Sequence, residues 1–275
     1  MIDIGPIKIG KGSPLAFILG PCVMETEELV YNTAKILKNN CPYPFIFKSS
    51  FDKANRSSIH SFRGLGLKTG LSLLKQIKKD FDLLVTTDVH LPEQVLEAAE
   101  VCDLIQIPAF LSRQTDLILE SAKTQKPIHV KKGQFIAPHD MKQVVIKIEE
   151  MGNKNILLGE RGFCFGYNNL VVDMRSIPIM KETNYPVCFD ATHSVQLPGG
   201  LGNATSGERK FLPTLALAAI SAGADAIFIE THPNPKIAKS DAANQWPLQD
   251  LMPLLDSLNA LHEFLQGKEL VPTYV

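Results

Sequence analysis

The sequence predicts a (β/α)8 barrel with a short N-terminal β-hairpin. Short β-rich apolar runs alternate eight times with longer stretches of helical apolar spacing, and a polar or Gly/Pro-containing turn follows each run. Charged or metal-capable side chains stand at the end of nearly every run, where barrel enzymes build their active sites. Since 275 residues show no break in composition, we expect a single barrel domain spanning residues 1–275.

The elements follow one another in the order that such a barrel requires. Residues 2–11, with alternating isoleucines and glycine punctuation, predict a hairpin that caps the bottom of the barrel. The predicted strands, each a short apolar run, are 16–19, 44–48, 83–87, 104–107, 128–130, 156–158, 187–190 and 226–230. The predicted helices, each with apolar residues at helical spacing, are 27–38, 66–80, 92–99, 114–124, 138–151, 169–182, 210–222 and 246–266.

Composition and charge exclude several classes of protein. The formal net charge of −1 argues against a nucleic-acid or membrane-surface protein, because such partners normally require a strong excess of Lys and Arg. The five cysteines are an odd number, widely spaced, and no leader with a cleavage site precedes the first strand, so we expect a reduced, cytoplasmic protein. The apolar run 15–19 is too short to span a bilayer, and no other segment predicts a transmembrane helix.

A first group of site candidates is cationic. Lys48, Lys53 and Arg56 follow the second predicted strand, Lys131 and Lys132 the fifth, and Arg161 the sixth. From three loops of one rim they can converge on a cleft and bind two phosphate groups, since Arg offers a bidentate fork and Lys a point charge. The alternative is a solvated charged surface, above all for Lys53 and Lys132. Nucleic acid is disfavoured because Asp52 interrupts the group and no aromatic platform accompanies it.

A second group predicts a metal site. Cys22 follows the first predicted strand, His193 the seventh, Glu230 ends the eighth, and Asp241 lies in the loop beyond. A thiolate, an imidazole and two carboxylates suit one Fe²⁺, Zn²⁺ or Mn²⁺ ion per subunit, and the first and eighth strands are neighbours in a closed barrel. Each residue taken singly has a structural alternative: a buried hydrophobic thiol, a hydrogen-bonded loop histidine, an ion pair or a helix N-cap. His90 and His232 remain rival ligands on spacing.

The glycine-rich stretch 197–209 follows the seventh predicted strand. Long loops at this rim commonly close over bound substrate and exclude water, so a lid is one interpretation, and an ordinary surface loop is the other.

Specific motifs are distributed along nearly the whole chain. They are GPC (20–22), FKSSFDKANRSS (47–58), TDVH (87–90), QIPAF (106–110), VKKGQ (130–134), RG (161–162), FGYNNL (165–170), DATHSVQ (190–196) and ETHP (230–233). The most specific is the block KANRSS within residues 47–58. Together these motifs resemble one family, the 3-deoxy-D-manno-octulosonate 8-phosphate synthases.

The resemblance implies condensation of phosphoenolpyruvate with D-arabinose 5-phosphate, with release of phosphate, in the synthesis of the inner sugar of lipopolysaccharide, by a homotetramer. By motif position, the residues implied to bind phosphoenolpyruvate are Lys48, Lys53, Gln106, Ala109, Lys131 and Arg161. Those implied to hold the sugar phosphate are Asn55, Arg56 and Ser57, and Gln196 completes the substrate-binding set. The candidate catalytic residues are Lys48, Asp88, Lys131 and His193.

Within this family, Cys at the first strand is typical of metal-dependent members and Asn of metal-independent ones, so Cys22 favours metal dependence. The segment 239–248 is similar to the metal-dependent version, although Asn244, Trp246 and the loop 203–209 depart from the pattern. Three alternatives stay open: a heptulosonate 7-phosphate synthase using erythrose 4-phosphate, which has a Lys-Pro-Arg-Thr type of block; a lysine-imine aldolase using Lys131; and a non-catalytic barrel that binds a sugar phosphate.

Overall fold

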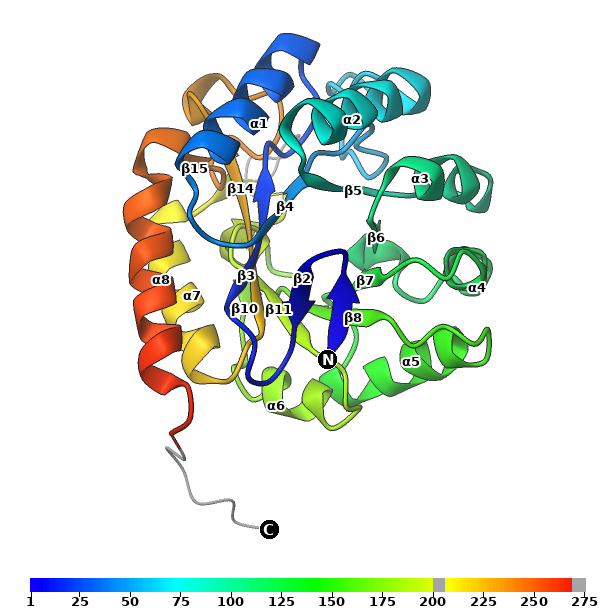
Figure 1. Ribbon diagram of the computed structural model, residues 1–275, viewed down its shortest axis with the longest axis vertical. Coiled ribbons are helices and arrows are strands. Elements are labelled where there is room, and N and C mark those ends of the chain that lie inside the picture. The colour runs from blue at the N-terminus through cyan, green and yellow to red at the C-terminus, as the bar shows by residue number, and fades with distance from the viewer. Residues whose placement is uncertain (200–205, 269–275) are drawn as a thin grey trace.

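Eight parallel strands close into a barrel in the computed structural model, which describes residues 1–199 and 206–268 (Figure 1). Each strand pairs with the next one along the chain, and the last pairs with both the seventh and the first, which closes the sheet. The predicted (β/α)8 fold is confirmed. In chain order the strands are β3 (Ala16–Gly20), β4 (Phe45–Lys48), β5 (Leu84–Asp88), β6 (Leu104–Ile107), β7 (Ile128–Lys131), β8 (Ile156–Glu160), β11 (Val187–Asp190) and β14 (Ala226–His232).

The strands are buried on both faces, which explains their nearly continuous apolar sequences. Alternate residues belong to two separate clusters. On β3, Phe17 and Leu19 pack with the surrounding helices, whereas Ala16 and Ile18 belong to a smaller cluster inside the barrel. A barrel of eight strands is just wide enough for side chains to fill, so this interior is a packed core and not a channel.

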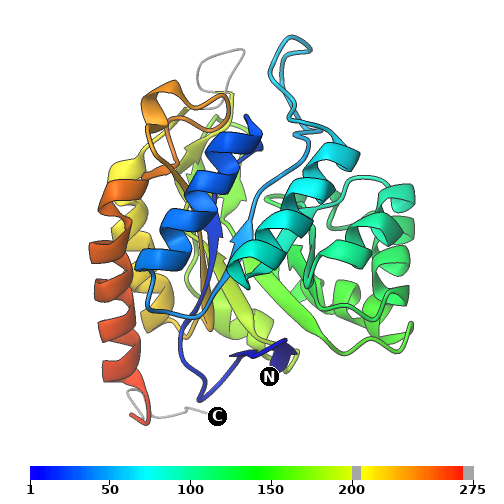
Figure 2. The ribbon, with the colours of Figure 1, turned by 45° about the horizontal axis from the view of Figure 1, so that its top comes forward.

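The N-terminal hairpin closes the amino end of the barrel. Its strands β1 (Ile2–Ile4) and β2 (Ile7–Ile9) pair antiparallel, and their four isoleucines belong to the inner cluster. Figure 2 shows this hairpin at the bottom of the barrel, opposite the end from which the segment after β4 projects. The predicted hairpin is confirmed, and the apolar alternation explains it because Asp3 and Lys8 face solvent between buried isoleucines.

The helices surround the barrel (Figure 1). They are α1 (Glu27–Asn40), α2 (Leu67–Phe81), α3 (Val95–Val101), α4 (Thr115–Lys123), α5 (Met141–Glu149), α6 (Ser176–Lys181), α7 (Leu212–Ser221) and α8 (Leu251–Leu265). In α1 the Thr26 side chain caps the first turn by accepting a hydrogen bond from the Leu29 N–H. Among the described residues, none of the helices has the length and apolarity needed to cross a bilayer.

Two predicted helices begin too early. The prediction 169–182 is wrong at its start, because β10 (Leu170–Val171) pairs antiparallel with β9 (Phe163–Cys164) and α6 begins only at Ser176. The prediction 246–266 fails in the same way, because β15 (Trp246–Pro247) extends the sheet beside the end of β14. In both cases pairing with an earlier strand outweighs the local apolar spacing.

Three further helices are preceded by a 3-10 turn that overlaps the start of the predicted span. These turns are Pro92–Gln94, Pro138–Asp140 and Arg209–Phe211. Two of them begin with proline, whose fixed φ suits a first turn. The differences change the helix boundaries but not the order of the elements.

Candidate active site at the carboxyl ends of the strands

A cavity of about 500 Å³ lies at the carboxyl ends of the strands. Nearly all of the predicted site residues line it, although they come from many different loops. Those that do are Lys48, Lys53, Asn55, Arg56, Ser57, Asp88, Gln106, Ala109, Lys131, Arg161, His193, Gln196, Glu230 and Asp241. Cys22 is fully buried beside two of these residues. The geometry therefore brings the two groups that the sequence singled out to one place.

Lys48 ends β4 and is held on three sides. Its Nζ donates to Glu230 Oε1 at 2.9 Å, to Ser50 Oγ at 2.9 Å and to the Cys22 carbonyl oxygen at 3.0 Å. Lys53 Nζ lies 4.0 Å from the same Glu230 oxygen. The charge of Lys48 thus compensates a buried carboxylate and fixes the main chain at Cys22.

Gly20, at the end of β3, makes that close packing possible. A Cβ atom at this position would lie 2.0 Å from the Lys48 carbonyl oxygen, and the backbone has a φ of +151°. Only glycine permits this approach, so Gly20 lets the chain turn toward Cys22 while β3 and β4 stay in contact.

A second buried cluster joins β7 and β11. Lys131 Nζ donates to Asp190 Oδ2 and lies 3.4 Å from the centre of the Phe228 ring. His193 Nδ1 lies 2.7 Å from the same carboxylate oxygen, and the His193 N–H donates to Asp190 Oδ1 at 2.9 Å. Burial lowers the pKa of Lys131, and the Asp190 carboxylate only partly offsets this effect. Asp190 therefore orients both a lysine and an imidazole toward the cavity.

Asp88, at the end of β5, has its own imidazole partner. Its Oδ2 lies 3.0 Å from His90 Nε2, and its Oδ1 accepts a hydrogen bond from Ser50 Oγ. Burial acts to raise the pKa of Asp88, but the His90 hydrogen bond and the Lys48 charge keep it well below its usual range. His90, which spacing alone left as a rival metal ligand, pairs with Asp88 instead.

Arg161 connects the two groups of predicted residues. Its Nη2 donates to Gln196 Oε1 at 2.5 Å, and Gln196 Nε2 donates to Asp241 Oδ1 at 2.7 Å. The buried Arg161 Nε has no hydrogen-bond partner in residues 1–199 and 206–268. A guanidinium that is held on one side and unpartnered on the other is suited to bind an anion.

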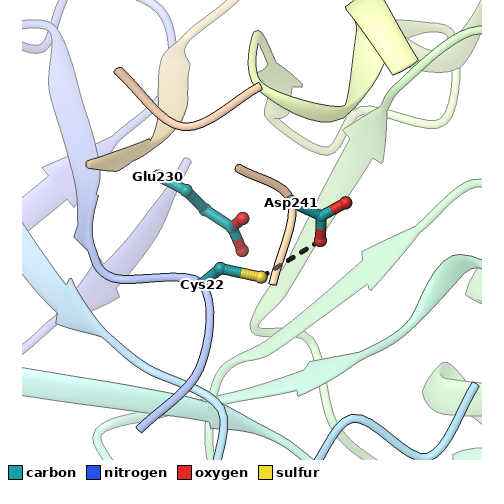
Figure 3. Close-up of side chains that lie close together, drawn as sticks. All are labelled: Cys22, Glu230 and Asp241. Carbon is teal, nitrogen blue, oxygen red and sulfur yellow. Dashed lines mark hydrogen bonds between the residues drawn. The ribbon is translucent and has the colours of Figure 1, made fainter. Parts of the chain in front are cut away.

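Cys22, Glu230 and Asp241 come together as a candidate metal centre (Figure 3). One ligand atom of each lies within 4.8 Å of the others. His193 lies outside this group, but its Nε2 is 3.4 Å from Glu230 Oε2 while its Nδ1 contacts Asp190. When a carboxylate binds one ring nitrogen of a histidine, it commonly orients the other ring nitrogen toward a metal. The rival His232 lies against Glu25, at 3.4 Å.

The donor set fits a divalent cation. Glu230 Oε2 is buried without a hydrogen-bond partner in the part of the chain that is described, which leaves an acceptor for a cation. Burial, with the Glu230 carboxylate nearby, raises the pKa of the Cys22 thiol, whose Sγ lies 3.1 Å from Asp241 Oδ2. Burial opposes ionisation of Glu230, yet His193 and Lys48 lower its pKa to about 2. Cation binding would therefore displace the thiol proton.

Asn55, Arg56 and Ser57 lie on the segment between β4 and α2, which rises from this end of the barrel in Figure 2. Asn55 and Ser57 are exposed, whereas Arg56 is half-buried and donates through Nε to the Phe62 carbonyl oxygen at 2.9 Å. The segment therefore offers polar side chains at the entrance of the cavity.

Comparison with known proteins decides the family. A model of the DAHP synthetase I family matches residues 1–266. The 2-dehydro-3-deoxyphosphooctonate aldolase of Protochlamydia amoebophila is 55% identical over 268 residues, which cover 96% of this chain and 98% of the relative. Those of Trichlorobacter lovleyi (53% over 263 residues; 94% and 97%) and Francisella tularensis subsp. holarctica (50% over 270 residues; 97% and 98%) are similar.

The chain belongs to the 2-dehydro-3-deoxyphosphooctonate aldolase family. This is another name for the 3-deoxy-D-manno-octulosonate 8-phosphate synthases, so the resemblance inferred from the motifs is confirmed. The DAHP synthetase model covers a broader family, to which the heptulosonate alternative belongs.

For this member of the aldolase family, the sequence-based prediction was wrong about one residue near the site and missed another. Lys132 is not part of the cavity or of a solvated surface: its fully buried Nζ lies 3.5 Å from Glu160 Oε1 and 3.6 Å from the centre of the Phe163 ring. Asp190 ends the predicted strand 187–190 and is in neither predicted group of site residues, although it is the common partner of Lys131 and His193. Its position two strands from Lys131 in the barrel was the available signal.

The predicted lid 197–209 lies partly outside the described residues. Of its stems, β12 (Gln196–Leu197) pairs antiparallel with β13 (Ser206–Gly207). Residues 200–205 are not described, so the lid stays a prediction.

Proposed function

We propose that this chain condenses phosphoenolpyruvate with D-arabinose 5-phosphate and water to give 3-deoxy-D-manno-octulosonate 8-phosphate and phosphate, a step in the synthesis of the lipopolysaccharide sugar KDO. The observation that carries the proposal is the cavity. Its lining combines buried cationic side chains with Asn55, Arg56 and Ser57, the residues that we assign to the sugar phosphate. The relatives' shared name supports the same reaction. We extend the proposal to one barrel domain over the whole chain, assembled as a cytoplasmic homotetramer.

Two anionic substrates must be neutralised and oriented before they react. Lys53, Lys131 and Arg161 bind the carboxylate and phosphate of phosphoenolpyruvate, with Gln106 and Ala109 beside them. Asn55, Arg56 and Ser57 hold the phosphate of the sugar at the entrance, which directs its aldehyde inward. Lys48 supplies charge from the floor of the site. Holding the two carbons in register is itself a large part of the rate enhancement.

The reaction then needs one carbon–carbon bond and one water. C3 of phosphoenolpyruvate attacks the aldehyde carbon, water adds at C2, and the tetrahedral intermediate loses phosphate by C–O cleavage. As it adds, the water gives up one proton and the aldehyde oxygen gains one; when phosphate leaves, the new C2 hydroxyl becomes the ketone and its proton goes to the departing phosphate. Asp88 with His90 is a carboxylate–imidazole pair at the cavity wall that can accept and return these protons, whereas His193, whose Nδ1 is held by Asp190, would help to hold the cation instead.

Cys22, His193, Glu230 and Asp241 would hold one divalent cation, Fe²⁺, Zn²⁺ or Mn²⁺. When bound, the cation would orient the aldehyde end of the sugar or the water as a Lewis acid. Its role is tested by chelator treatment followed by measurement of metal content and activity. We expect activity to fall with metal content and to return with one of the three ions, and full activity in metal-free protein would overturn this part of the proposal.

The substrate proposal is tested by measuring phosphate release from phosphoenolpyruvate with each sugar phosphate in turn, with mass spectrometry of the product. We expect rapid release with D-arabinose 5-phosphate and little with erythrose 4-phosphate, since residues 53–57 read KANRS. Faster release with erythrose 4-phosphate would establish the heptulosonate reaction instead. No release with either sugar would favour a binding protein.

A lysine-imine mechanism is the second candidate, because burial lowers the pKa of Lys131 and so favours a neutral amine. We expect no imine, since Lys131 Nζ is engaged by Asp190. Borohydride reduction during turnover, followed by peptide mass spectrometry, separates the two mechanisms. A reduced adduct on Lys131 would establish the imine.

A further inference from the structure

The two segments that carry Cys22 and Asp241 are joined by a reciprocal pair of hydrogen bonds. The Cys22 N–H donates to Gln245 Oε1 at 3.1 Å, and the Lys239 N–H donates to Glu25 Oε1 at 2.8 Å. Each segment therefore offers one side-chain acceptor to a backbone N–H of the other. Gln245 is fully buried and Glu25 is 8% exposed. We call this pair of bonds the clamp.

Gln245 also fixes the turn on which Asp241 stands. Its Nε2 donates to the Ser240 carbonyl oxygen at 2.8 Å, and the N–H groups of Asn244 and Gln245 both donate to the Asp241 carbonyl oxygen, at 2.9 and 3.0 Å. Asp241 has a φ of +45°, a left-handed conformation that costs a non-glycine residue on the order of 1 kcal/mol. The surrounding hydrogen bonds hold the residue there, and with it the direction of its carboxylate.

The clamp lies next to the candidate metal centre without being part of it. Neither Glu25 nor Gln245 lines the cavity, and neither belongs to the metal-capable group. A bound cation requires its donor atoms at about 2.0–2.3 Å, so the spacing between the thiol and the carboxylate must be held closely. Cys22 Sγ and Asp241 Oδ2 are 3.1 Å apart, and the bonds of the clamp join the same two segments that carry these donor atoms.

We propose that Gln245 and Glu25 are positioning residues that fix the spacing of Cys22 and Asp241 and thereby set the affinity of the site for a divalent cation. An amide suits position 245 because it accepts from one segment and donates within the other, which neither a carboxylate nor an apolar side chain can do. The inference rests on the proposed metal role of Cys22 and Asp241 and assigns two further residues to it.

The test uses Co²⁺ as the probe, with its dissociation constant measured by competition with a chromophoric chelator and the thiolate–Co²⁺ absorption band recorded in parallel. Gln245→Met keeps the side-chain volume and removes both hydrogen bonds, and Glu25→Met removes the other half of the clamp. We expect each variant to bind Co²⁺ about 10–100-fold more weakly than the unmodified protein. We expect the absorption band to be shifted or weakened.

Two matched controls isolate the clamp from the fold. Glu25→Gln keeps an acceptor for the Lys239 N–H and should bind Co²⁺ within about twofold of the unmodified protein. Asn244→Ala removes a buried amide from the same turn whose side-chain atoms contact no hydrogen-bond partner in the described ranges, and it should also bind nearly normally. Thermal melting establishes that each variant is folded, and if Gln245→Met is not, Glu25→Met against Glu25→Gln carries the test.

The outcomes separate this inference from the proposal it rests on. If the unmodified protein binds no Co²⁺, the metal role of Cys22 fails and the clamp has no function. If the unmodified protein binds Co²⁺ but Gln245→Met and Glu25→Met bind it equally well, the clamp alone is overturned. An Asn244→Ala variant as weak as Gln245→Met would also overturn it, because any disturbance of the turn would then suffice.

Discussion

The two ends of the barrel use the same residue types for different purposes. At the amino end, two similar ion pairs lie just before β6 and β14. Asp103 binds Lys78 Nζ at 2.6 Å and the Val85 N–H at 3.0 Å. Asp225 binds Lys181 Nζ at 2.8 Å and the Val187 N–H at 2.9 Å. Each carboxylate joins a neighbouring strand to the helix that precedes that strand, α2 with β5 and α6 with β11, and both of its oxygens are used.

At the carboxyl end the charges are more deeply buried and incompletely paired. The side chains of Lys131 and Asp190 are 6% and 1% exposed, compared with 38% and 17% for Lys78 and Asp103. Buried atoms of Gln106, Arg161 and Glu230 have no hydrogen-bond partner within the described part of the chain. Such atoms cost free energy in the folded protein unless a ligand satisfies them. The amino end is arranged for stability and the carboxyl end for binding.

The largest effect is expected from a substitution at the carboxyl end. Lys131→Met removes a buried cation aimed at the cavity, and we expect the rate of phosphate release to fall about 10²–10³-fold, as when one preorganised electrostatic group is lost. The variant should be less stable but still folded, because Asp190 loses one buried partner and keeps its bonds to His193. Steady-state kinetics and thermal melting measure the two effects. A variant that is unfolded, or one that is fully active, would contradict the division between the ends.

The opposite result is expected at the amino end. Asp225→Ala leaves the buried Val187 N–H without its acceptor and Lys181 without its carboxylate, so we expect a loss of about 2–3 kcal/mol in the free energy of unfolding. Activity per folded molecule should stay unchanged, since Asp225 lies far along β14 from Glu230. Urea unfolding and kinetics at low temperature check both statements. A large fall in activity without a loss of stability would show that the ends are coupled.

The sequence predicts the residues at the strand ends better than the residues and short strands that surround them. The order of the strands and the residues at their ends follow from apolar spacing, because each strand end of a closed barrel faces the same cavity. That reasoning reaches Lys131 and Glu230 but not Gln245, because its proposed role depends on two hydrogen bonds, one of them to Cys22, which is 223 residues away. It also misjudges Lys132, because adjacent residues of a strand point to opposite faces and the second lysine enters a buried pocket of carbonyl oxygens. The early starts assigned to two helices arise because β10 and β15 are two-residue strands defined by pairing with another strand, which apolar spacing does not reveal.

His129 is a buried titratable residue inside the barrel, one inward position below Lys131 on β7. Burial lowers its pKa from 6.5 to about 3, and both ring nitrogens lack partners among the residues described. Because the folded pKa lies below the unfolded one, the unfolded chain binds more protons, and stability falls as pH drops from about 6.5 toward 3. At pH 5 the loss amounts to ~2 kcal/mol. Between pH 7 and pH 5, we expect the free energy of unfolding of His129→Met, measured with urea, to fall by ~2 kcal/mol less than that of the unmodified protein. Equal falls would mean that His129 is charged or hydrated in the folded protein.

The smallest expected effect compares the two members of one amino-end pair. Lys181→Met removes hydrogen bonds of 2.8 Å to Asp225 and to the Gly223 carbonyl oxygen, but the lysine side chain is 32% exposed. Asp225 also keeps the Val187 N–H. Because the buried Asp225 carboxylate is still hydrogen-bonded and only the partly exposed lysine is removed, we expect a loss of about 1 kcal/mol, smaller than for Asp225→Ala, with unchanged activity. Urea unfolding measures both losses in the free energy of unfolding. If the two losses are equal, the ion pair and not the bond to the Val187 N–H stabilises this end. The contrast with the incompletely paired charges around the cavity would then be wrong.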